Sequence, residues 1–388
     1  MKKIAVVTAT RAEYGLLKPL ISALEKHENF QLLLFVTGMH LLPKFGNTYK
    51  EIENDGFSIA AKVYDDLSGD SSKAIVQSLA KVTEGFSTVF ETHKPDLIVV
   101  LGDRSEILAV VMAAIIFNIP IAHIRGGETT EGAYDEFIRH AITKMSHLHF
   151  ASTETYRKRI IQMGEHPSRA FNVGEIGIDS IKKLTLLTKR EFEDSIAHKI
   201  DRNFVLITFH PVTLEKATAK EQFSELIQAL DTLEATTLLF TKPNSDKDGQ
   251  AIVDLIDSYV SQNPKKAVAF TSLGQLRYLS AASHATFVIG NSSSGISEVP
   301  YFNVPTINIG DRQKGRIMAK SVINCKPMRN DIVKAIKFAM SKPFKTKIQN
   351  QEQLYGNGQA TSKIMHELLA FDYTEIQKKF YDVKFPID

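Results

Sequence analysis

Three groups of charged residues follow one another closely between residues 96 and 140 of this chain. Gly102-Asp103-Arg104 ends an apolar run over 97–101, and a segment from His123 to Glu128 ends a second run over 119–122. A third group follows at once and consists of Asp135, Glu136, Arg139 and His140. Neighbouring parallel strands deliver their carboxyl ends to one sheet edge, where such folds bind ligands. Carboxylates gathered there repel one another and push their pKa values apart, as a general acid and a general base require.

Each of these groups also has a purely structural interpretation. Asp103 follows a strand, so it is either the N-cap of a helix that begins near Glu106 or a catalytic group. Arg125 and Arg139 suit ion pairs with the carboxylates, and Gly126-Gly127 permits a tight turn or a close approach of the backbone to a ligand.

Three further segments follow predicted strands and suit the binding of an anionic ligand. Thr8 to Gly15 leads into a helix, where small residues, the helix N-terminus and Arg11 favour an anion. His210 follows the strand 204–208. A lone histidine is more often structural than catalytic, but its position at the carboxyl end of a strand favours a functional role. The loop from Gly290 to Glu298 is rich in serine and suits a diphosphate, with Glu298 placed to accept hydrogen bonds from ribose hydroxyls. No P-loop lysine follows it, which argues against P-loop NTP hydrolysis.

The elements that must position these residues alternate between short apolar runs and longer amphipathic segments, which is typical of βαβ units with a parallel sheet. The first half is predicted to hold strands at Lys3–Thr8, Gln31–Val36, Asp96–Leu101, Pro120–Ile124 and Leu148–Ala151, and helices at Tyr14–Lys26, Ser72–Glu91 and Tyr134–Ser146. The second half is predicted to hold strands at Phe204–Thr208, Thr237–Thr241, Ala267–Thr271, Thr286–Ile289 and Thr306–Ile309. We therefore expect an α/β protein of two doubly wound parallel-sheet domains facing a cleft, with a hinge between residues 171 and 200.

Composition excludes several classes of function. The 388 residues suit two domains of roughly 150–200 residues each. The net charge of +3, from 47 basic and 44 acidic residues, implies neither nucleic acid nor an anionic membrane as a partner. The single cysteine, Cys325, rules out a disulfide framework and cysteine-based zinc sites. The first residues are not followed by a signal-peptide core, and no apolar run approaches the roughly 18 residues of a membrane helix. We expect a cytoplasmic protein.

Taken together, these residues resemble the hydrolysing UDP-N-acetylglucosamine 2-epimerases, in the branch that serves sialic and legionaminic acid biosynthesis. The resemblance covers nearly the whole chain and rests on motifs in the family's order at 8–15, 36–40, 102–106, 123–128, 135–144, 210–213, 291–298 and 355–358. One position departs from the family: many relatives place a catalytic glutamate where this chain has Arg125, and here the carboxylate comes later, as Glu128.

The resemblance implies the GT-B fold, a UDP-sugar as ligand, a homodimer, and no metal or other cofactor. Its implied domains are an N-terminal Rossmann-like domain (1–175) with the acid/base residues, a C-terminal Rossmann-like domain (176–365) that binds UDP, and a helical tail (366–388) that packs back on the first. The implied catalytic residues are Asp103, Glu128, Asp135, Glu136 and His210. The implied UDP and substrate contacts are Arg11, Arg139, Lys242, Asn244, Arg277, Ser292, Ser293, Ser294 and Glu298.

The family's reaction removes UDP by anti elimination to a 2-acetamidoglucal and then adds water syn to give the free manno-configured sugar. We expect N-acetylmannosamine and UDP as products from UDP-GlcNAc. The alternatives are a UDP-N,N'-diacetylbacillosamine 2-epimerase, a GT-B glycosyltransferase that requires an acceptor, and a nucleotide-sugar-binding regulator. A regulator would keep its function when Asp103 is replaced by Asn, whereas an enzyme would lose turnover.

Overall fold

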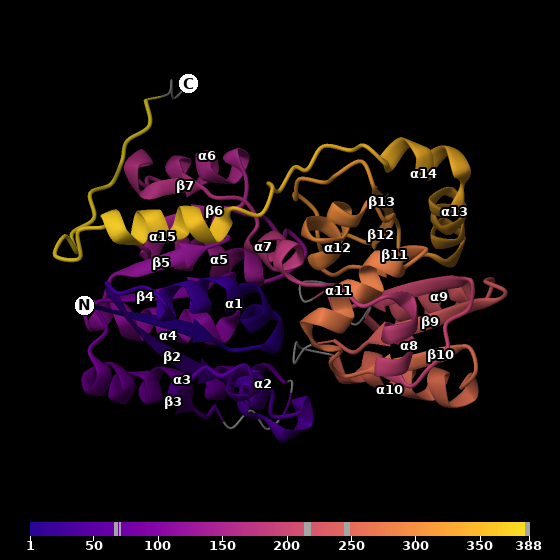
Figure 1. The fold of residues 1–388 in the computed structure, drawn as a ribbon, viewed down its shortest axis with the longest axis horizontal. Coiled ribbons are helices and arrows are strands. Elements are labelled where there is room, and N and C mark those ends of the chain that lie inside the picture. The colour runs from indigo at the N-terminus through magenta and orange to yellow at the C-terminus, as the bar shows by residue number, and fades with distance from the viewer. Residues whose placement is uncertain (66–68, 70, 213–218, 244–248, 385–388) are drawn as a thin grey trace. The chain divides into compact units, whose positions relative to one another are not determined.

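The chain folds into two compact units in the computed structural model, which describes residues 1–65, 69, 71–212, 219–243 and 249–384 (Figure 1). Unit 1 comprises residues 1–128, 135–183 and 355–388, and unit 2 comprises residues 129–134 and 184–354. The short segment 129–134 thus belongs to unit 2, although the chain on both sides of it belongs to unit 1. The domain boundaries that the family resemblance implies, at residues 175 and 365, stay predictions. Compactness alone does not show that a unit folds as a domain by itself.

Unit 1 is built on a parallel sheet in the order β3-β2-β1-β4-β5-β6-β7. Its strands are β1 (Lys2–Thr8), β2 (Phe30–Thr37), β3 (Ile59–Val63), β4 (Leu97–Leu101), β5 (Ile121–Ile124), β6 (Leu148–Ala151) and β7 (Ala170–Asn172). Strand β1 pairs with both β2 and β4, so the strand order reverses there. Doubly wound folds bind ligands beside such a reversal, at the carboxyl ends of the strands.

Unit 2 repeats this plan with a parallel sheet in the order β10-β9-β8-β11-β12-β13. Its strands are β8 (Asn203–Thr208), β9 (Thr236–Thr241), β10 (Ala267–Phe270), β11 (Phe287–Gly290), β12 (Thr306–Ile309) and β13 (Val322–Cys325). Here β8 pairs with both β9 and β11, which places the equivalent reversal beside residues 208–210 and 290–294.

Helices cover both faces of each sheet. Those of unit 1 are α1 (Arg11–Glu25), α2 (Tyr49–Asn54), α3 (Ser72–His93), α4 (Ser105–Ile116), α5 (Asp135–Met145), α6 (Glu154–Gln162), α7 (Ile176–Lys183) and α15 (Ala360–Ala370). Those of unit 2 are α8 (Lys189–Ile196), α9 (Ala219–Leu230), α10 (Gly249–Gln262), α11 (Gly274–His284), α12 (Ser294–Ser297), α13 (Arg329–Met340) and α14 (Lys342–Ile348). Short 3-10 helices lie at Gly38–Leu41, Pro43–Phe45, Pro167–Arg169 and Val299–Phe302.

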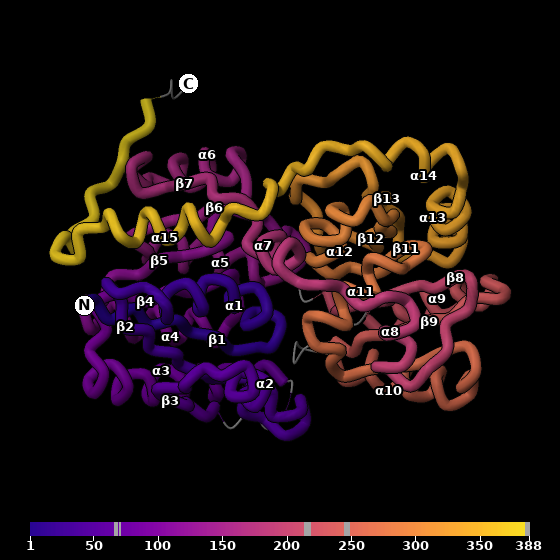
Figure 2. The backbone as a smooth tube through the Cα atoms, viewed as in Figure 1, coloured from indigo at the N-terminus to yellow at the C-terminus, as the bar shows by residue number. Residues whose placement is uncertain are grey.

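The alternation of side chains along β1 shows how the two layers form. Ile4 and Val6 point into a core shared with α1 and α15, while Ala5 and Val7 point into a core shared with α3 and α4. Both faces of the strand are therefore buried, as a continuous apolar run in a parallel sheet requires. Helix α15, yellow in Figure 2, comes from the end of the chain and shares the first of these cores with α1.

The predicted central strands and helices are confirmed, most strand ends to within one residue. The predictions missed β3, β7 and β13, which lie at sheet edges and are partly exposed, so their sequences carry no continuous apolar run. Across the part of the chain that the structure describes, no helix is both long and apolar enough to cross a membrane.

Candidate active site

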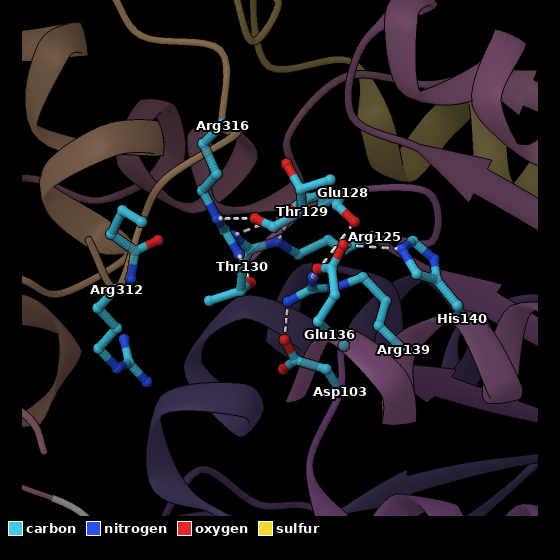
Figure 3. A network of polar contacts seen from close by, with 12 residues as sticks. Asp103, Arg125, Glu128, Thr129, Thr130, Glu136, Arg139, His140, Arg312 and Arg316 are labelled. Carbon is cyan, nitrogen blue, oxygen red and sulfur yellow. Dashed lines mark hydrogen bonds and ion pairs between the residues drawn. The ribbon is translucent and has the colours of Figure 1, made fainter. Parts of the chain in front are cut away.

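Two arginines and four carboxylates form a polar network at the carboxyl edge of the unit 1 sheet. Figure 3 shows both arginines with Asp103, Glu128 and Glu136. Asp103 follows β4, Arg125 and Glu128 follow β5, and Glu136 and Arg139 lie on α5. The sixth member, Glu175, immediately precedes α7. The sequence prediction that Arg125 and Arg139 form ion pairs with the neighbouring carboxylates is confirmed.

Arg139 is the centre of one half of this network. Its side chain is 1% exposed, and its guanidinium contacts a carboxylate oxygen of Asp103 and, at 3.3 Å, one of Glu136. It also donates to the backbone carbonyl of Glu128 at 3.2 Å. A charge buried this deeply is tolerated because its donors are paired, and it fixes the two carboxylates relative to each other. Its predicted contact with substrate stays a prediction.

The alternative interpretation of Asp103 as a helix cap is wrong. Helix α4 begins at Ser105, its N-cap residue is Arg104, and no side chain caps it. The carboxylate of Asp103 is paired with Arg139 instead and is 23% exposed, so it still reaches solvent. Asp103 is thus both paired with a cation and accessible to solvent.

Arg125 is the centre of the other half. Its Nε lies 3.3 Å from Glu128 Oε1 and 3.2 Å from Glu175 Oε2, and both carboxylates are almost fully buried. Ser152 donates its hydroxyl proton to Glu128 at 2.7 Å. Arg125 adopts a φ of +67°, an unfavourable conformation for a residue with a side chain. Such strain persists where the surroundings impose it, and functional sites are a common place for it.

A buried histidine fixes the strand end that carries Asp103. His123 on β5 lies 2.7 Å from the carbonyl of Gly102 through Nε2 and 3.1 Å from the hydroxyl of Thr143 through Nδ1. Burial lowers the pKa of His123 to about 3, so the ring is neutral at pH 7. The carbonyl needs a donor, so Nε2 carries the proton and Nδ1 accepts from Thr143.

The glycine pair after Arg125 serves packing. A Cβ on Gly127, whose φ is +73°, would lie 2.5 Å from the carbonyl oxygen of Tyr156 on α6. Arg159 on the same helix donates to the Gly127 carbonyl at 2.7 Å. The close backbone approach that the sequence allowed is therefore to a helix of the protein.

A second, mostly neutral cluster lies at the carboxyl edge of the unit 2 sheet. His210 follows β8, and the side chain of Asn291, which follows β11, binds its backbone twice: Oδ1 accepts from the His210 N–H at 2.7 Å, and Nδ2 donates to its carbonyl at 2.8 Å. The serine loop continues from Asn291 into α12, where the hydroxyls of Ser294 and Tyr278 lie 2.7 Å apart. The structure thus brings His210 beside the serine loop, in agreement with the strand order.

The remaining predicted contacts lie at several places. Glu298 caps the C-terminal end of α12, beside the serine loop. Lys242 follows β9 and forms an ion pair with Asp257 on α10, and Arg277 lies on α11, where it donates to the carbonyl of Leu273. Arg11 is the first residue of α1 in unit 1, Asp135 is the first residue of α5, and Asn244 lies outside the described residues.

Sequence reasoning missed Glu175 and Ser152 as members of the first cluster. Glu175 lies fifty positions from Arg125 in a segment that reads as a linker, so no local pattern signals the pair.

Known proteins match this chain along nearly its whole length. The family profile of UDP-N-acetylglucosamine 2-epimerase matches residues 22–369. A Campylobacter jejuni protein named GDP/UDP-N,N'-diacetylbacillosamine 2-epimerase (hydrolyzing) is 43% identical over 89% of both chains. The Escherichia coli polysialic acid biosynthesis protein P7 is 38% identical over 99% of this chain and 98% of its own.

A solved structure agrees with the fold. UDP-GlcNAc 2-epimerase from Neisseria meningitidis, bound to UDP-GlcNAc, superposes with a TM-score of 0.80 at 20% identity, covering 96% of this chain and all of that one. The expected GT-B-like fold of two doubly wound domains is therefore confirmed. On the match of the family profile and of relatives along nearly its whole length, the chain belongs to the hydrolysing UDP-N-acetylglucosamine 2-epimerase family.

Proposed function

We propose that this enzyme acts on a UDP-activated 2-acetamido sugar, eliminating UDP and then adding water to give the free 2-epimeric sugar. The network around Arg125 and Arg139 is the observation that carries this proposal. Asp103 and Glu136 form ion pairs with Arg139 and reach solvent at 23% and 18% exposure, so they suit proton transfer to and from a bound sugar.

The chemistry needs one proton taken and one returned. In the elimination, a carboxylate removes the proton from carbon 2 while the bond from carbon 1 to the diphosphate oxygen breaks, which leaves a 2-acetamidoglucal and UDP. In the hydration, a proton returns to carbon 2 from the other face and water adds its oxygen to carbon 1. We assign these transfers to Asp103, Glu128, Asp135 and Glu136, with His210 as a further acid/base group.

The departing UDP carries negative charge, so hydrogen-bond donors and cations both suit its binding. We assign the diphosphate and ribose to Ser292, Ser293, Ser294 and Glu298, with Arg11 at the phosphates. Lys242, Asn244, Arg139 and Arg277 complete the proposed contacts with nucleotide and substrate. Hydroxyl and backbone donors, together with these cations, stabilise the charge of the leaving diphosphate.

Two sugars are candidates for the substrate. The family resemblance ranks UDP-GlcNAc first, and the name of the Campylobacter relative favours UDP-N,N'-diacetylbacillosamine and admits GDP as the carrier. One assay separates them: nucleotide release is measured from UDP-GlcNAc, UDP-N,N'-diacetylbacillosamine and GDP-N,N'-diacetylbacillosamine, each without an acceptor sugar. The sugar with the highest kcat/KM is the substrate, and release from none of the three contradicts the proposal.

Product analysis in deuterated water tests the mechanism. The proposed route places deuterium at carbon 2 of a free sugar with inverted configuration there. A product without deuterium at carbon 2, or one joined to an added acceptor, contradicts it.

We also propose a homodimer, as the family resemblance implies. Helix α4 exposes Met112 (51%) and Ile116 (79%), an apolar surface that a second copy would cover. Sedimentation equilibrium measures the assembly directly.

A further inference from the structure

The segment 129–134 connects two acid/base candidates of unit 1 but is held by unit 2. Glu128 precedes it and Asp135 follows it, and both belong to unit 1, whereas Thr129–Tyr134 belongs to unit 2. The chain therefore crosses between the units on either side of this segment. Whatever fixes these six residues also fixes the covalent attachment of Glu128 and of the first turn of α5.

Unit 2 holds the segment through the loop at 311–316. Arg316 donates from Nε to the backbone carbonyl of Thr129 at 3.1 Å and from Nη2 to the hydroxyl of Thr130 at 3.5 Å (Figure 3). The Glu131 amide donates to the carbonyl of Lys314 at 3.3 Å. Thr129 and Thr130 are buried, so these contacts are shielded from competing water.

The backbone of segment 129–134 also lies against the backbone of the loop at 311–316. A Cβ added to Gly132 would lie 2.9 Å from both the Cα of Arg312 and the carbonyl oxygen of Asp311. Even a methyl group at residue 132 would thus force the segment away from the loop that holds it.

The loop at 311–316 also contacts Asn291, which leads into the serine loop at 290–298. The side chains of Arg312 and Gln313 donate to the backbone carbonyl of Asn291 at 3.2 and 2.9 Å. Gln313 is completely buried. The loop at 311–316 therefore contacts both the start of the proposed diphosphate site and the 129–134 segment.

We propose that Arg316 is a positioning residue: by holding segment 129–134 it aligns Glu128, which precedes the segment, with the start of α5, which follows it. The inference rests on the proposed function of Glu128, Asp135 and Glu136 in proton transfer. It assigns to Arg316 an effect on turnover without contact with the reacting atoms.

The first test is the kinetics of Arg316→Ala and Arg316→Lys in the full-length enzyme, on whichever sugar nucleotide the wild type turns over. Misplacing a catalytic group by about 1 Å costs on the order of 100-fold in rate, so we expect Arg316→Ala to lower kcat by about 10- to 100-fold. The KM and the calorimetric affinity for UDP should change less than about 3-fold, because the hydroxyls and backbone of the serine loop remain. Arg316→Lys keeps a single donor and should recover part of the loss.

The second test moves the segment without touching Arg316. Gly132→Ala inserts the methyl group against Asp311 and Arg312 and should reproduce the selective loss of kcat. Gly69→Ala is the matched control, since neither glycine has a left-handed φ and a Cβ at residue 69 would meet nothing within 4 Å. Lys314→Ala removes an exposed ion pair with Glu131 and should leave kcat unchanged.

Hydrogen exchange gives a readout that needs no substrate. Without ligand, the Glu131 and Ala133 amides, which donate to Lys314 and Thr130, should exchange about tenfold faster in Arg316→Ala than in the wild type. Unchanged exchange there, or wild-type kcat in both Arg316→Ala and Gly132→Ala, overturns the inference. A fall in UDP affinity in step with kcat also overturns it, since Arg316 would then be a nucleotide contact. If the wild type releases no nucleotide from any of the three sugar nucleotides, the proposed function fails. Hydrogen exchange alone then decides whether Arg316 holds the segment.

Discussion

The carboxyl edges of the two sheets share a strand plan but differ in their electrostatics. At the edge of unit 1, Arg125 and Arg139 form ion pairs with four carboxylates, of which Glu128 and Glu175 are buried. At the edge of unit 2, Asn291 binds the backbone of His210 through its side-chain amide, Ser294 pairs with Tyr278 through hydroxyls, and Arg312 donates to the backbone carbonyl of Asn291. The same fold position therefore carries arginine–carboxylate ion pairs in one unit and mainly hydrogen bonds of amide, hydroxyl and backbone groups in the other.

This difference suggests a division of labour. Ion pairs in a low-dielectric place hold carboxylates ionised and aligned, which serves proton transfer. Hydroxyl and backbone donors after a strand suit the binding of an anion such as a diphosphate. We expect substitutions at the unit 1 edge to lower kcat and substitutions at the unit 2 edge to lower nucleotide affinity.

The largest effect is expected for Asp103→Asn. The amide is isosteric but cannot exchange a proton, so kcat should fall by about 100- to 10,000-fold. UDP affinity, measured by calorimetry, should stay within about 3-fold of the wild type, because this change leaves the unit 2 edge intact. Glu53→Gln, which removes an exposed ion pair with Lys62 in the same unit, is the control and should keep wild-type kcat. Undiminished turnover in Asp103→Asn would show that this carboxylate has no part in proton transfer.

A smaller effect of the other kind is expected for Asn291→Ala. The change leaves the buried N–H and carbonyl of His210 without the side chain that now binds both. Unmet buried groups cost about 1–3 kcal/mol each, so the free energy of unfolding should fall by about 2 kcal/mol or more. UDP affinity should fall about tenfold, a loss of about 1.4 kcal/mol, with a smaller change in kcat.

Asn308→Ala is the matched control for that variant. Asn308 lies at the end of the neighbouring strand β12 and is equally buried, but its side chain binds the side chain of Asn324 and not a backbone group. It should keep UDP affinity. If both asparagine variants weaken UDP binding alike, the bracing of His210 is not what matters at this edge.

The sequence predicted the central strands of both sheets and most of the charged residues at their edges. Strands β4 and β11 are buried on both faces, so their unbroken apolar runs were visible without any knowledge of the fold. Edge strands such as β13 pack on one side only and carry no such run.

Pairing between distant segments was beyond the sequence. Glu175 pairs with Arg125 because the chain, after β7, passes back beside the carboxyl end of β5. No local sequence pattern encodes that return. The contact of Arg316 with segment 129–134 is hidden for the same reason, since Arg316 and Thr129 are 187 positions apart in the sequence. Motif reading finds the residues that surround a site, and only tertiary structure shows which of them hold one another.

The smallest effect concerns Glu13, a charge at the unit 1 edge that lacks an arginine as close as those of the network. It completes a capping box with Thr10 at the start of α1, and its Oε2 accepts from the amides of Ala9 and Thr10. Burial outweighs these hydrogen bonds and the attraction of Arg104, and it raises the pKa of Glu13 to about 7 from 4.5. Between pH 4.5 and 7 this carboxyl is ionised in the unfolded chain but still protonated in the folded protein. Its contribution should therefore lower the free energy of unfolding as pH rises from 4.5 to 7, and the lowering should persist above pH 7.

Glu13→Gln removes that titration and keeps an oxygen acceptor for the two amides. We expect equal stability of variant and wild type near pH 4.5, and a variant more stable by about 1–3 kcal/mol at pH 8, measured by urea unfolding across this range. Glu191→Gln is the matched control, because Glu191 completes the same capping box with Thr188 on α8 but is exposed and has a lowered pKa. Its titration lies below this window, so the change should leave the slope between pH 5 and 8 as it is. A parallel shift of both variants, with no change in slope for Glu13→Gln, would mean that Glu13 is ionised throughout and that the unit 1 edge stabilises charge even without a close arginine.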